Sequence, residues 1–266
     1  MRNRQGGRAR ALVVGILLAG STGAALAGDH PGGAAAHHWG YEGAEGPNQW
    51  GSLGFPACST GKSQSPIDLQ PATEEAAEPI PFDYKPAPVS VVNNGHTIQF
   101  TMPGTSSITL GGKKFTLAQF HFHSGSEHTL KGRAFPMEVH LVHKAEDGEL
   151  AVVGVFLTTG EGNSGGAGGA ANATLDTVFG ALPGKAGLTL TSEATIDPAA
   201  LLPAERTYYK YKGSLTTPPC SEGVNWFVMA TPMTISTRQL LHYTSVFMNN
   251  ARPPQPLNGR TLSLAK

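Results

Sequence analysis

Three histidines with a regular spacing are the residues of this chain best suited to chemistry. His121 and His123 stand one residue apart, so on a β-strand their side chains would project to one face, with Phe120 and Phe122 on the other. A second strand that carries His140 could close a cup of three nitrogens. Zinc held by three protein ligands keeps a fourth position open for water, which distinguishes a catalytic zinc site from a structural one.

Two histidines separated by one residue are weak evidence by themselves, because such pairs also occur as surface or core residues bonded to their neighbours. Glu127 and Glu138 near these histidines favour the metal site, since carboxylates commonly orient metal-binding imidazoles. Further along, the hydroxyl groups of Thr216 and Thr217 precede two prolines, which stiffen the loop. The pattern therefore predicts a catalytic metal site rather than isolated histidines.

Short motifs follow one another along the chain, namely HWGY (38–41), QSPI (64–67), NNGH (93–96), QFHFH (119–123), GSEHT (125–129), EVHLVH (138–143) and GSLTTPPC (213–220). In this order they resemble the α-class carbonic anhydrases, in particular the exported bacterial members, from about Trp39 to Arg260. The resemblance implies a β-dominated α+β domain (residues 28–266) around a large, twisted, mostly antiparallel sheet of about ten strands, with a few short peripheral helices. It also implies reversible hydration of CO2 to bicarbonate and a proton, by attack of zinc-bound hydroxide on CO2.

The resemblance also implies a role for individual residues. The Zn²⁺ ligands would be His121, His123 and His140, and the rings of His121 and His140 would donate to Gln119 and Glu138. Thr216 would donate to Glu127 and accept from the zinc-bound hydroxide, His96 would carry the proton away, and His128 would bond to Tyr211 without a catalytic role.

The substrate and the departing proton would each have their own side of the cavity. Carbon dioxide carries no charge, so the family receives it on a largely apolar wall, here matched by Val142, Val152, Leu215, Thr217, Val224 and Trp226. Without the resemblance, the apolar members of this set would be assigned to the core. Tyr41, Asn94 and Gln99 would line the polar side and order water beside His96.

The composition narrows the classes of partner. Only 14% of the 266 residues are charged and the formal net charge is zero, so no basic field would attract nucleic acid.

The 34 glycines and 20 prolines suit a loop-rich β protein. Hairpins are predicted from residues 89–92 with 97–102 and 107–110 with 114–117, central strands at 137–143, 151–157 and 224–230, and helices at 174–179 and 236–244.

The first residues predict export. Arg2, Arg4, Arg8 and Arg10 precede a short apolar stretch (11–19) and an Ala-Leu-Ala sequence that ends at Ala27, which is typical of a cleavable signal peptide over residues 1–27. The apolar stretch is well short of the ~20 residues that a membrane span needs. We therefore expect a periplasmic or secreted protein with no membrane span after cleavage.

Two cysteines, Cys58 and Cys220, are present in the chain. An even number in an oxidising compartment favours a disulfide, and some exported relatives in the family bridge the equivalent positions. Two buried thiols that never meet are the alternative.

Other functions remain open at this stage. A non-catalytic binding protein on the same fold would usually have lost a zinc ligand, whereas all three histidines are present here together with Thr216 and Glu127. Zinc scavenging would call for a histidine-rich segment, of which only His30, His37 and His38 give a hint. Esterase chemistry is plausible as a side activity, and the sequence leaves open whether the protein forms a homodimer.

Overall fold

A computed structural model describes residues 38–69, 72–159, 171–180 and 182–266. The predicted signal peptide, residues 1–27, and the histidines at positions 30 and 37 lie outside these ranges. So does most of the glycine-rich sequence EGNSGGAGGAA (161–171), which precedes the first predicted helix.

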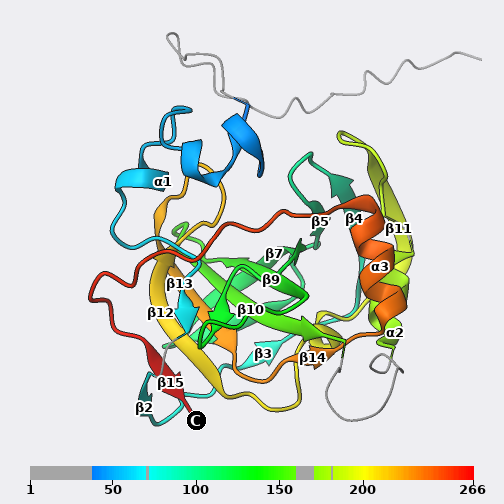
Figure 1. The fold of residues 1–266 in the computed structure, drawn as a ribbon. Coiled ribbons are helices and arrows are strands. Elements are labelled where there is room, and N and C mark those ends of the chain that lie inside the picture. The colour runs from blue at the N-terminus through cyan, green and yellow to red at the C-terminus, as the bar shows by residue number, and fades with distance from the viewer. Residues whose placement is uncertain (1–37, 70–71, 160–170, 181) are drawn as a thin grey trace, which may run out of the picture. The chain divides into compact units, whose positions relative to one another are not determined.

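A mixed sheet of 13 strands dominates the part of the chain that is described (Figure 1). Ten of its strands follow one another in the order β11-β4-β5-β7-β9-β10-β13-β12-β15-β2, with β3, β6 and β14 attached at the side. Most neighbours are antiparallel, and the parallel pairs are β10 with β13, β10 with β14 and β15 with β2. The predicted fold class is confirmed.

The strands of this sheet are β2 (Thr73–Glu75), β3 (Phe82–Asp83), β4 (Ala87–Asn93), β5 (Ile98–Thr101), β6 (Ser107–Leu110), β7 (Lys113–Ser124), β9 (Met137–Lys144), β10 (Leu150–Thr158), β11 (Thr189–Ile196), β12 (Tyr208–Ser214), β13 (Glu222–Met229), β14 (Met233–Thr234) and β15 (Ser263–Ala265). A separate parallel pair joins β1 (Asp68–Leu69) to β8 (Thr129–Leu130). The α-helices are α1 (Ala57–Thr60), α2 (Ala173–Phe179) and α3 (Thr237–Val246), and 3-10 turns span Gly43–Glu45, Pro47–Gln49 and Pro198–Leu201.

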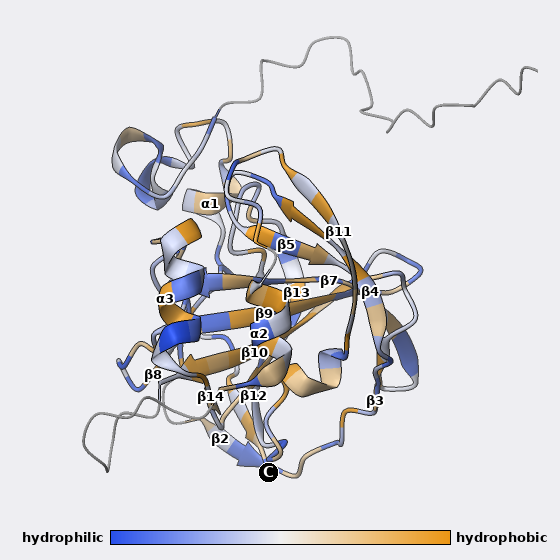
Figure 2. Cartoon of the chain, turned by 90° about the vertical axis from the view of Figure 1, so that its right-hand side faces the viewer, coloured by the Kyte–Doolittle hydropathy of each residue, from blue (hydrophilic) through white to orange (hydrophobic). Residues whose placement is uncertain are grey.

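Alternation along the central strands divides the hydrophobic core between the two faces of the sheet. On one face, Phe122 packs against Phe179 of α2 and Tyr243 of α3, with ring centroids 5.0 and 5.6 Å apart. On the other face, Val152 and Trp226 belong to a second buried cluster. Figure 2 shows that β10 is hydrophobic over most of its length, whereas hydrophobic and hydrophilic residues alternate along β7 and β9. The site described below lies on the second face.

The local predictions are largely confirmed. Both hairpins are present, β4 with β5 and β6 with β7, and the three central strands became β9, β10 and β13. Helix α3 begins after Ser236, which forms a capping box with Gln239, and α2 begins after Asn172, whose side-chain oxygen accepts from the next turn. The helix boundaries follow from these capping residues. No helix in the described ranges is long and apolar enough to cross a membrane.

The predicted disulfide is present between Cys58 and Cys220, which are 162 residues apart. It lies in a cluster of buried residues with Trp50, against which Trp39 and Tyr41 pack. In the chain-entropy model, a link across so long a loop stabilises the fold by about 5 kcal/mol. The bond therefore fastens the first described residues to the loop that carries Thr216.

Candidate metal centre and active site

The three predicted ligands converge on one point of the sheet. His121 on β7 lies directly opposite His140 on β9, and His123 follows on the same face of β7. The ring centroids of His123 and His140 are 4.6 Å apart. The centroid of the His121 ring lies 5.0 Å from that of His123 and 5.4 Å from that of His140. One nitrogen from each ring lies within 4.8 Å of the other two, which is the spacing that a single metal ion requires.

Hydrogen bonds orient each ring so that one nitrogen stays free. The Nδ1 of His121 donates to Oε1 of Gln119 (2.8 Å), and the Nδ1 of His123 donates to the backbone carbonyl of Asn250 (2.7 Å). The Nε2 of His140 donates to Oε1 of Glu138 (2.9 Å). The nitrogens that face one another are therefore Nε2 of His121, Nε2 of His123 and Nδ1 of His140.

Burial keeps these rings neutral. Desolvation lowers the pKa of His121 well below its usual value and lowers the pKa of His123 to about 3, and the neighbouring rings add to both shifts. The pKa of His140 is lowered mainly by burial. The Nε2 of His123 is buried and has no hydrogen-bond partner, although a buried polar atom without a partner costs free energy. Three neutral imidazole nitrogens with one unsatisfied member fit a zinc ion.

Glu138 connects the cup to a buried network. Besides His140, its Oε1 accepts from Nδ1 of His128 (2.8 Å), and its Oε2 accepts from the backbone N–H groups of Glu127 (3.0 Å) and His128 (2.9 Å). The Nε2 of His128 bonds to the hydroxyl of Tyr211 (2.7 Å), as the resemblance implied. Burial raises the pKa of Glu138, but His128 and His140 outweigh it and hold this pKa well below the usual value. Four hydrogen-bond donors therefore fix the position of the Glu138 carboxylate.

Glu127 is fully buried and lies against the cup. Its Oε1 accepts from the backbone N–H of Arg252 (2.8 Å), whereas its Oε2 lies 3.4 Å from Nε2 of His123 and 3.7 Å from Nδ1 of His140 without a hydrogen bond. Burial raises the pKa of Glu127 well above its usual value, and the bonds from Arg252 and the Thr216 hydroxyl oppose the shift. The structure thus places Thr216, Glu127 and the histidines together.

The predicted apolar wall lies beside the cup. On the sheet Val152 pairs with Val142 on one side and with Trp226 on the other. The Trp226 ring lies 4.9 Å from the His140 ring, and its Nε1 donates to the Ser214 carbonyl (2.9 Å). The cluster that contains these residues also holds the predicted Val224 and Leu215. Thr217 is half-buried in the loop and accepts from Cys220 through its backbone carbonyl (2.9 Å).

The residues expected on the polar side have more varied surroundings. The His96 ring is stacked on Trp39, with centroids 3.6 Å apart, and burial followed by the charge of His38 lowers its pKa. The side-chain oxygen of Asn94 is taken up by the turn, where it accepts from the backbone N–H groups of residues 96 and 97 (2.9 Å each). Asn94 therefore shapes the turn that carries His96, in addition to any contact with water.

Gln99 and Tyr41 are the other two members of this set. Gln99 pairs with His121 across the sheet and donates to the Thr101 hydroxyl (3.2 Å). The Tyr41 hydroxyl is buried without a hydrogen-bond partner, which leaves it free to bond to an ordered water.

Asn250, Arg252 and Trp39 complete the site, and we did not predict them from the sequence. Asn250 orients His123 through a backbone carbonyl, and its side chain accepts from Ser124 N–H (2.8 Å) and donates to the carbonyl of Phe122 (3.0 Å). The backbone carbonyl of Asn250 acts on His123, which lies 127 positions earlier in the chain, and no sequence pattern indicates such a contact. Trp39 lies within the HWGY motif, so the resemblance could have indicated it.

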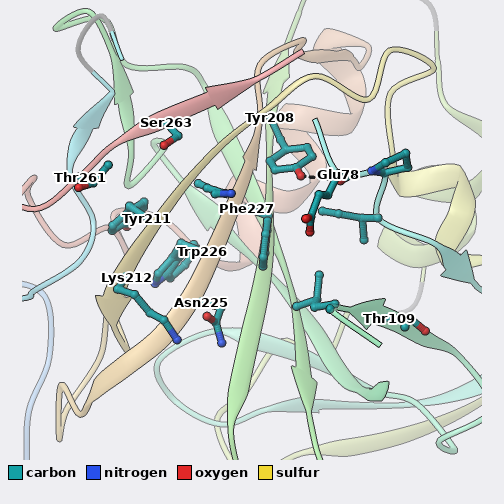
Figure 3. Close-up of a pocket in the computed structure, with 15 residues that line it drawn as sticks. Glu78, Thr109, Tyr208, Tyr211, Lys212, Asn225, Trp226, Phe227, Thr261 and Ser263 are labelled. Atoms are coloured by element: carbon teal, nitrogen blue, oxygen red, sulfur yellow. Dashed lines mark hydrogen bonds between the residues drawn. The ribbon is translucent and has the colours of Figure 1, made fainter. Parts of the chain in front are cut away.

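A cleft of about 380 Å³ is lined by residues of β12 and β13, among them Tyr208, Asn225 and Phe227, and by none of the three histidines (Figure 3). Its lining includes Lys210, Lys212, Asn225 and Phe227. These residues alternate along β12 and β13 with Tyr211 and Trp226, whose rings lie near His128 and His140. The two lysines already pair with acidic neighbours, Lys210 with Glu75 and Lys212 with Glu149. Among the predicted site residues, only Trp226 also lines this cleft.

Comparisons with known proteins agree with the geometry. The model of the eukaryotic-type carbonic anhydrase family matches residues 45–266. A carbonic anhydrase of Nostoc sp. is 42% identical over 84% of each chain, and one of Neisseria gonorrhoeae is 42% identical over 86% of this chain and 90% of its own. The solved α-carbonic anhydrase of Photobacterium profundum is 44% identical, with a TM-score of 0.78 over 85% of this chain and all of its own. That of Thermovibrio ammonificans, solved with the inhibitor sulfanilamide, is 42% identical with a TM-score of 0.80 over 86% of this chain and all of its own.

Proposed function

Since the chain belongs to the α-carbonic anhydrase family, whose members hydrate carbon dioxide, we propose that it does so through a zinc ion held by His121, His123 and His140. The observation that carries the proposal is the convergence of three neutral ring nitrogens, from the buried His123 and His140 and the half-buried His121, each freed by a hydrogen bond at the other nitrogen of its ring. Zinc bound to three histidines lowers the pKa of a coordinated water to about 7, the value known for this family.

Thr216 and Glu127 would orient the oxygen that attacks carbon dioxide. A threonine hydroxyl has one proton to donate and two lone pairs. The positive charge of a bound zinc would oppose the effect of burial and favour the ionised form of Glu127. With its proton given to that carboxylate, Thr216 would only accept from the attacking oxygen, so a lone pair of that oxygen would turn toward the substrate. Fixing the geometry of the attack in this way lowers its entropic cost.

The apolar wall would hold the substrate without binding it strongly. Carbon dioxide has no charge, so Val142, Val152 and Trp226 can receive it by excluding water. Bicarbonate, which is charged, would be held less well by the same surface and would leave.

His96 would move the product proton from the cavity to solvent. Its pKa is lowered by burial, so the ring is neutral at pH 7 and can accept a proton. His96→Ala should therefore lower kcat about tenfold or more, since a positioned acid–base group contributes roughly 10²–10⁴-fold, while kcat/KM stays nearly unchanged. Stopped-flow hydration assays in a dilute, bulky buffer measure both, and added imidazole should restore part of the lost kcat.

His38→Ala is the matched control, because its exposed ring lies near His96 with centroids 6.3 Å apart and pairs with Glu45. It should change kcat less than twofold. Full kcat in His96→Ala under weak buffering would rule out the shuttle.

Export belongs to the proposed function. Residues 1–27 would act as a cleaved signal peptide, and residues 28–266 would form the mature enzyme in the periplasm or outside the cell. The Cys58–Cys220 disulfide supports an oxidising compartment, because disulfides rarely persist in the cytosol.

Zinc content and carbon dioxide hydration, measured on one purified sample, test the function directly. We expect about one zinc per chain, loss of activity with a chelator and recovery when zinc is returned. Hydration that persists in metal-free protein would contradict the zinc mechanism, and stoichiometric zinc without hydration would favour a binding protein.

A further inference from the structure

The segment 250–252, which follows α3, touches the site at two points through its backbone. The carbonyl of Asn250 accepts from Nδ1 of His123 (2.7 Å), and the N–H of Arg252 donates to Oε1 of Glu127 (2.8 Å). This segment is neither helix nor strand. The orientation of one proposed zinc ligand and of Glu127 therefore depends on a stretch of chain that no ladder of backbone hydrogen bonds supports.

The side chain of Arg252 anchors this segment. Its guanidinium is buried and donates from Nη1 to Oε1 of Gln64 (2.9 Å) and the carbonyl of Ser65 (2.8 Å), and from Nη2 to the carbonyl of Cys58 (2.7 Å). It also lies over the Trp50 ring, 5.6 Å from its centroid. Gln64 in turn donates to the carbonyl of Cys220 (3.0 Å), so the anchor rests on both ends of the disulfide.

Stability alone does not account for an arginine at this position. The hydrogen bonds of its guanidinium go to neutral carbonyl and amide oxygens, its Nε is buried without a partner, and its charge is attracted by Glu127 without a hydrogen bond between the two side chains. Hydrogen bonds offset only part of the free energy that it costs to remove a charge from water, so a buried charge stabilises a fold poorly. Apolar residues of similar volume often replace such groups at little or no loss of stability. What an apolar residue could not do is hold the 250–252 backbone against Cys58, Gln64 and Ser65.

We propose that Arg252 is a positioning residue: its guanidinium fixes the 250–252 backbone so that His123 presents Nε2 to the metal and Glu127 presents its carboxylate to Thr216. The proposal rests on the zinc mechanism put forward above and adds to it a residue that touches neither substrate nor metal. Loss of the anchor should loosen both contacts together, because one short segment makes both.

The test compares Arg252→Met with Arg260→Met. Arg260 is a matched control, because its side chain also donates to carbonyl oxygens, those of Gln64 (2.8 Å), Lys212 (3.0 Å), Leu257 (2.8 Å) and Pro256 (2.9 Å). It also lies over an aromatic ring, that of Tyr211 at 5.5 Å. Its backbone N–H, however, donates to the Leu257 carbonyl (3.1 Å) and not to the site.

Zinc affinity, kcat/KM per bound zinc and melting temperature are measured for both variants. Arg252→Met should weaken zinc binding about tenfold or more, as loss of groups that orient metal ligands does, and should lower kcat/KM per bound zinc by a similar factor that imidazole does not restore. Arg260→Met should keep both values whatever its melting temperature. If Arg252→Met does not fold, Gln64→Met, which removes one acceptor of the guanidinium, should shift both values in the same direction by a smaller factor.

Equal zinc affinity and equal kcat/KM in Arg252→Met and Arg260→Met would overturn the inference and reduce Arg252 to a packing residue. Unchanged values in Gln64→Met, where that variant is the one that folds, would do the same. These outcomes differ from a failure of the proposed function, in which the unmodified protein itself would lack zinc or hydration.

Discussion

His121→Ala is expected to lose most of its zinc and nearly all carbon dioxide hydration while the chain still folds. The substitution removes one of three nitrogens from the cup, and two histidines with water hold zinc far more weakly than three. The strand itself should persist, because the core side of β7 is formed by Phe120 and Phe122, which are buried on the opposite face. Metal analysis, the hydration rate and circular dichroism of one preparation measure the three quantities.

His143→Ala is the matched control for this loss. His143 is also a buried histidine on β9, but it lies on the other face from His140 and bonds through Nε2 to the Tyr84 hydroxyl (2.8 Å). Its removal should lower the melting temperature and leave zinc in place. Stoichiometric zinc and normal hydration in His121→Ala would refute the ligand assignment.

Thr216→Val is expected to lower kcat and kcat/KM together, by about 100-fold, with zinc content unchanged. Valine keeps the shape of threonine and removes only the hydroxyl, so the attacking oxygen loses its acceptor and Glu127 loses a donor. Removal of one preorganised hydrogen bond at a reacting centre typically costs roughly 10²–10³-fold in rate. Stopped-flow assays at several imidazole concentrations provide the measurement.

The response to imidazole separates this variant from His96→Ala. Added imidazole supplies a proton acceptor, so it should help where proton transfer limits turnover and not where the attack itself is impaired. If imidazole restored Thr216→Val, or if only its kcat fell, Thr216 would belong to proton transfer and not to the attack.

The parts of the fold that could be predicted are those encoded by neighbouring residues. The alternation of His121 and His123 with phenylalanines identified the strand and its two faces, and the helix predicted at 236–244 begins one residue before α3. We did not predict β11 or β12. In β12, Lys210 and Lys212 alternate with the aromatic residues because its outer face reaches solvent, and this weakens the apolar pattern that indicates a strand.

The site, too, contains residues that neighbouring sequence could predict and residues that it could not. The three proposed zinc ligands lie, together with Gln119 and Glu138, within 21 positions of one another, so strand periodicity and the family motifs are enough to propose them. Asn250 and Arg252 reach the site through a carbonyl and an N–H, backbone groups that carry no sequence signal, and the guanidinium that anchors them bonds to residues 187 or more positions away. Their importance arises only when the folded chain brings them to positions 123 and 127, which no local pattern can encode.

The long separation of the two cysteines also bears on how the protein is made. Cys58 leaves the ribosome 162 residues ahead of Cys220, so its thiol must stay unpaired while most of the sheet is synthesised. With only two cysteines in the chain, one intramolecular pairing exists and no incorrect isomer can form within a molecule. The competing product is a covalent dimer of two nascent chains. The yield of correct enzyme should therefore depend on the concentration of newly made chains more than on a disulfide isomerase.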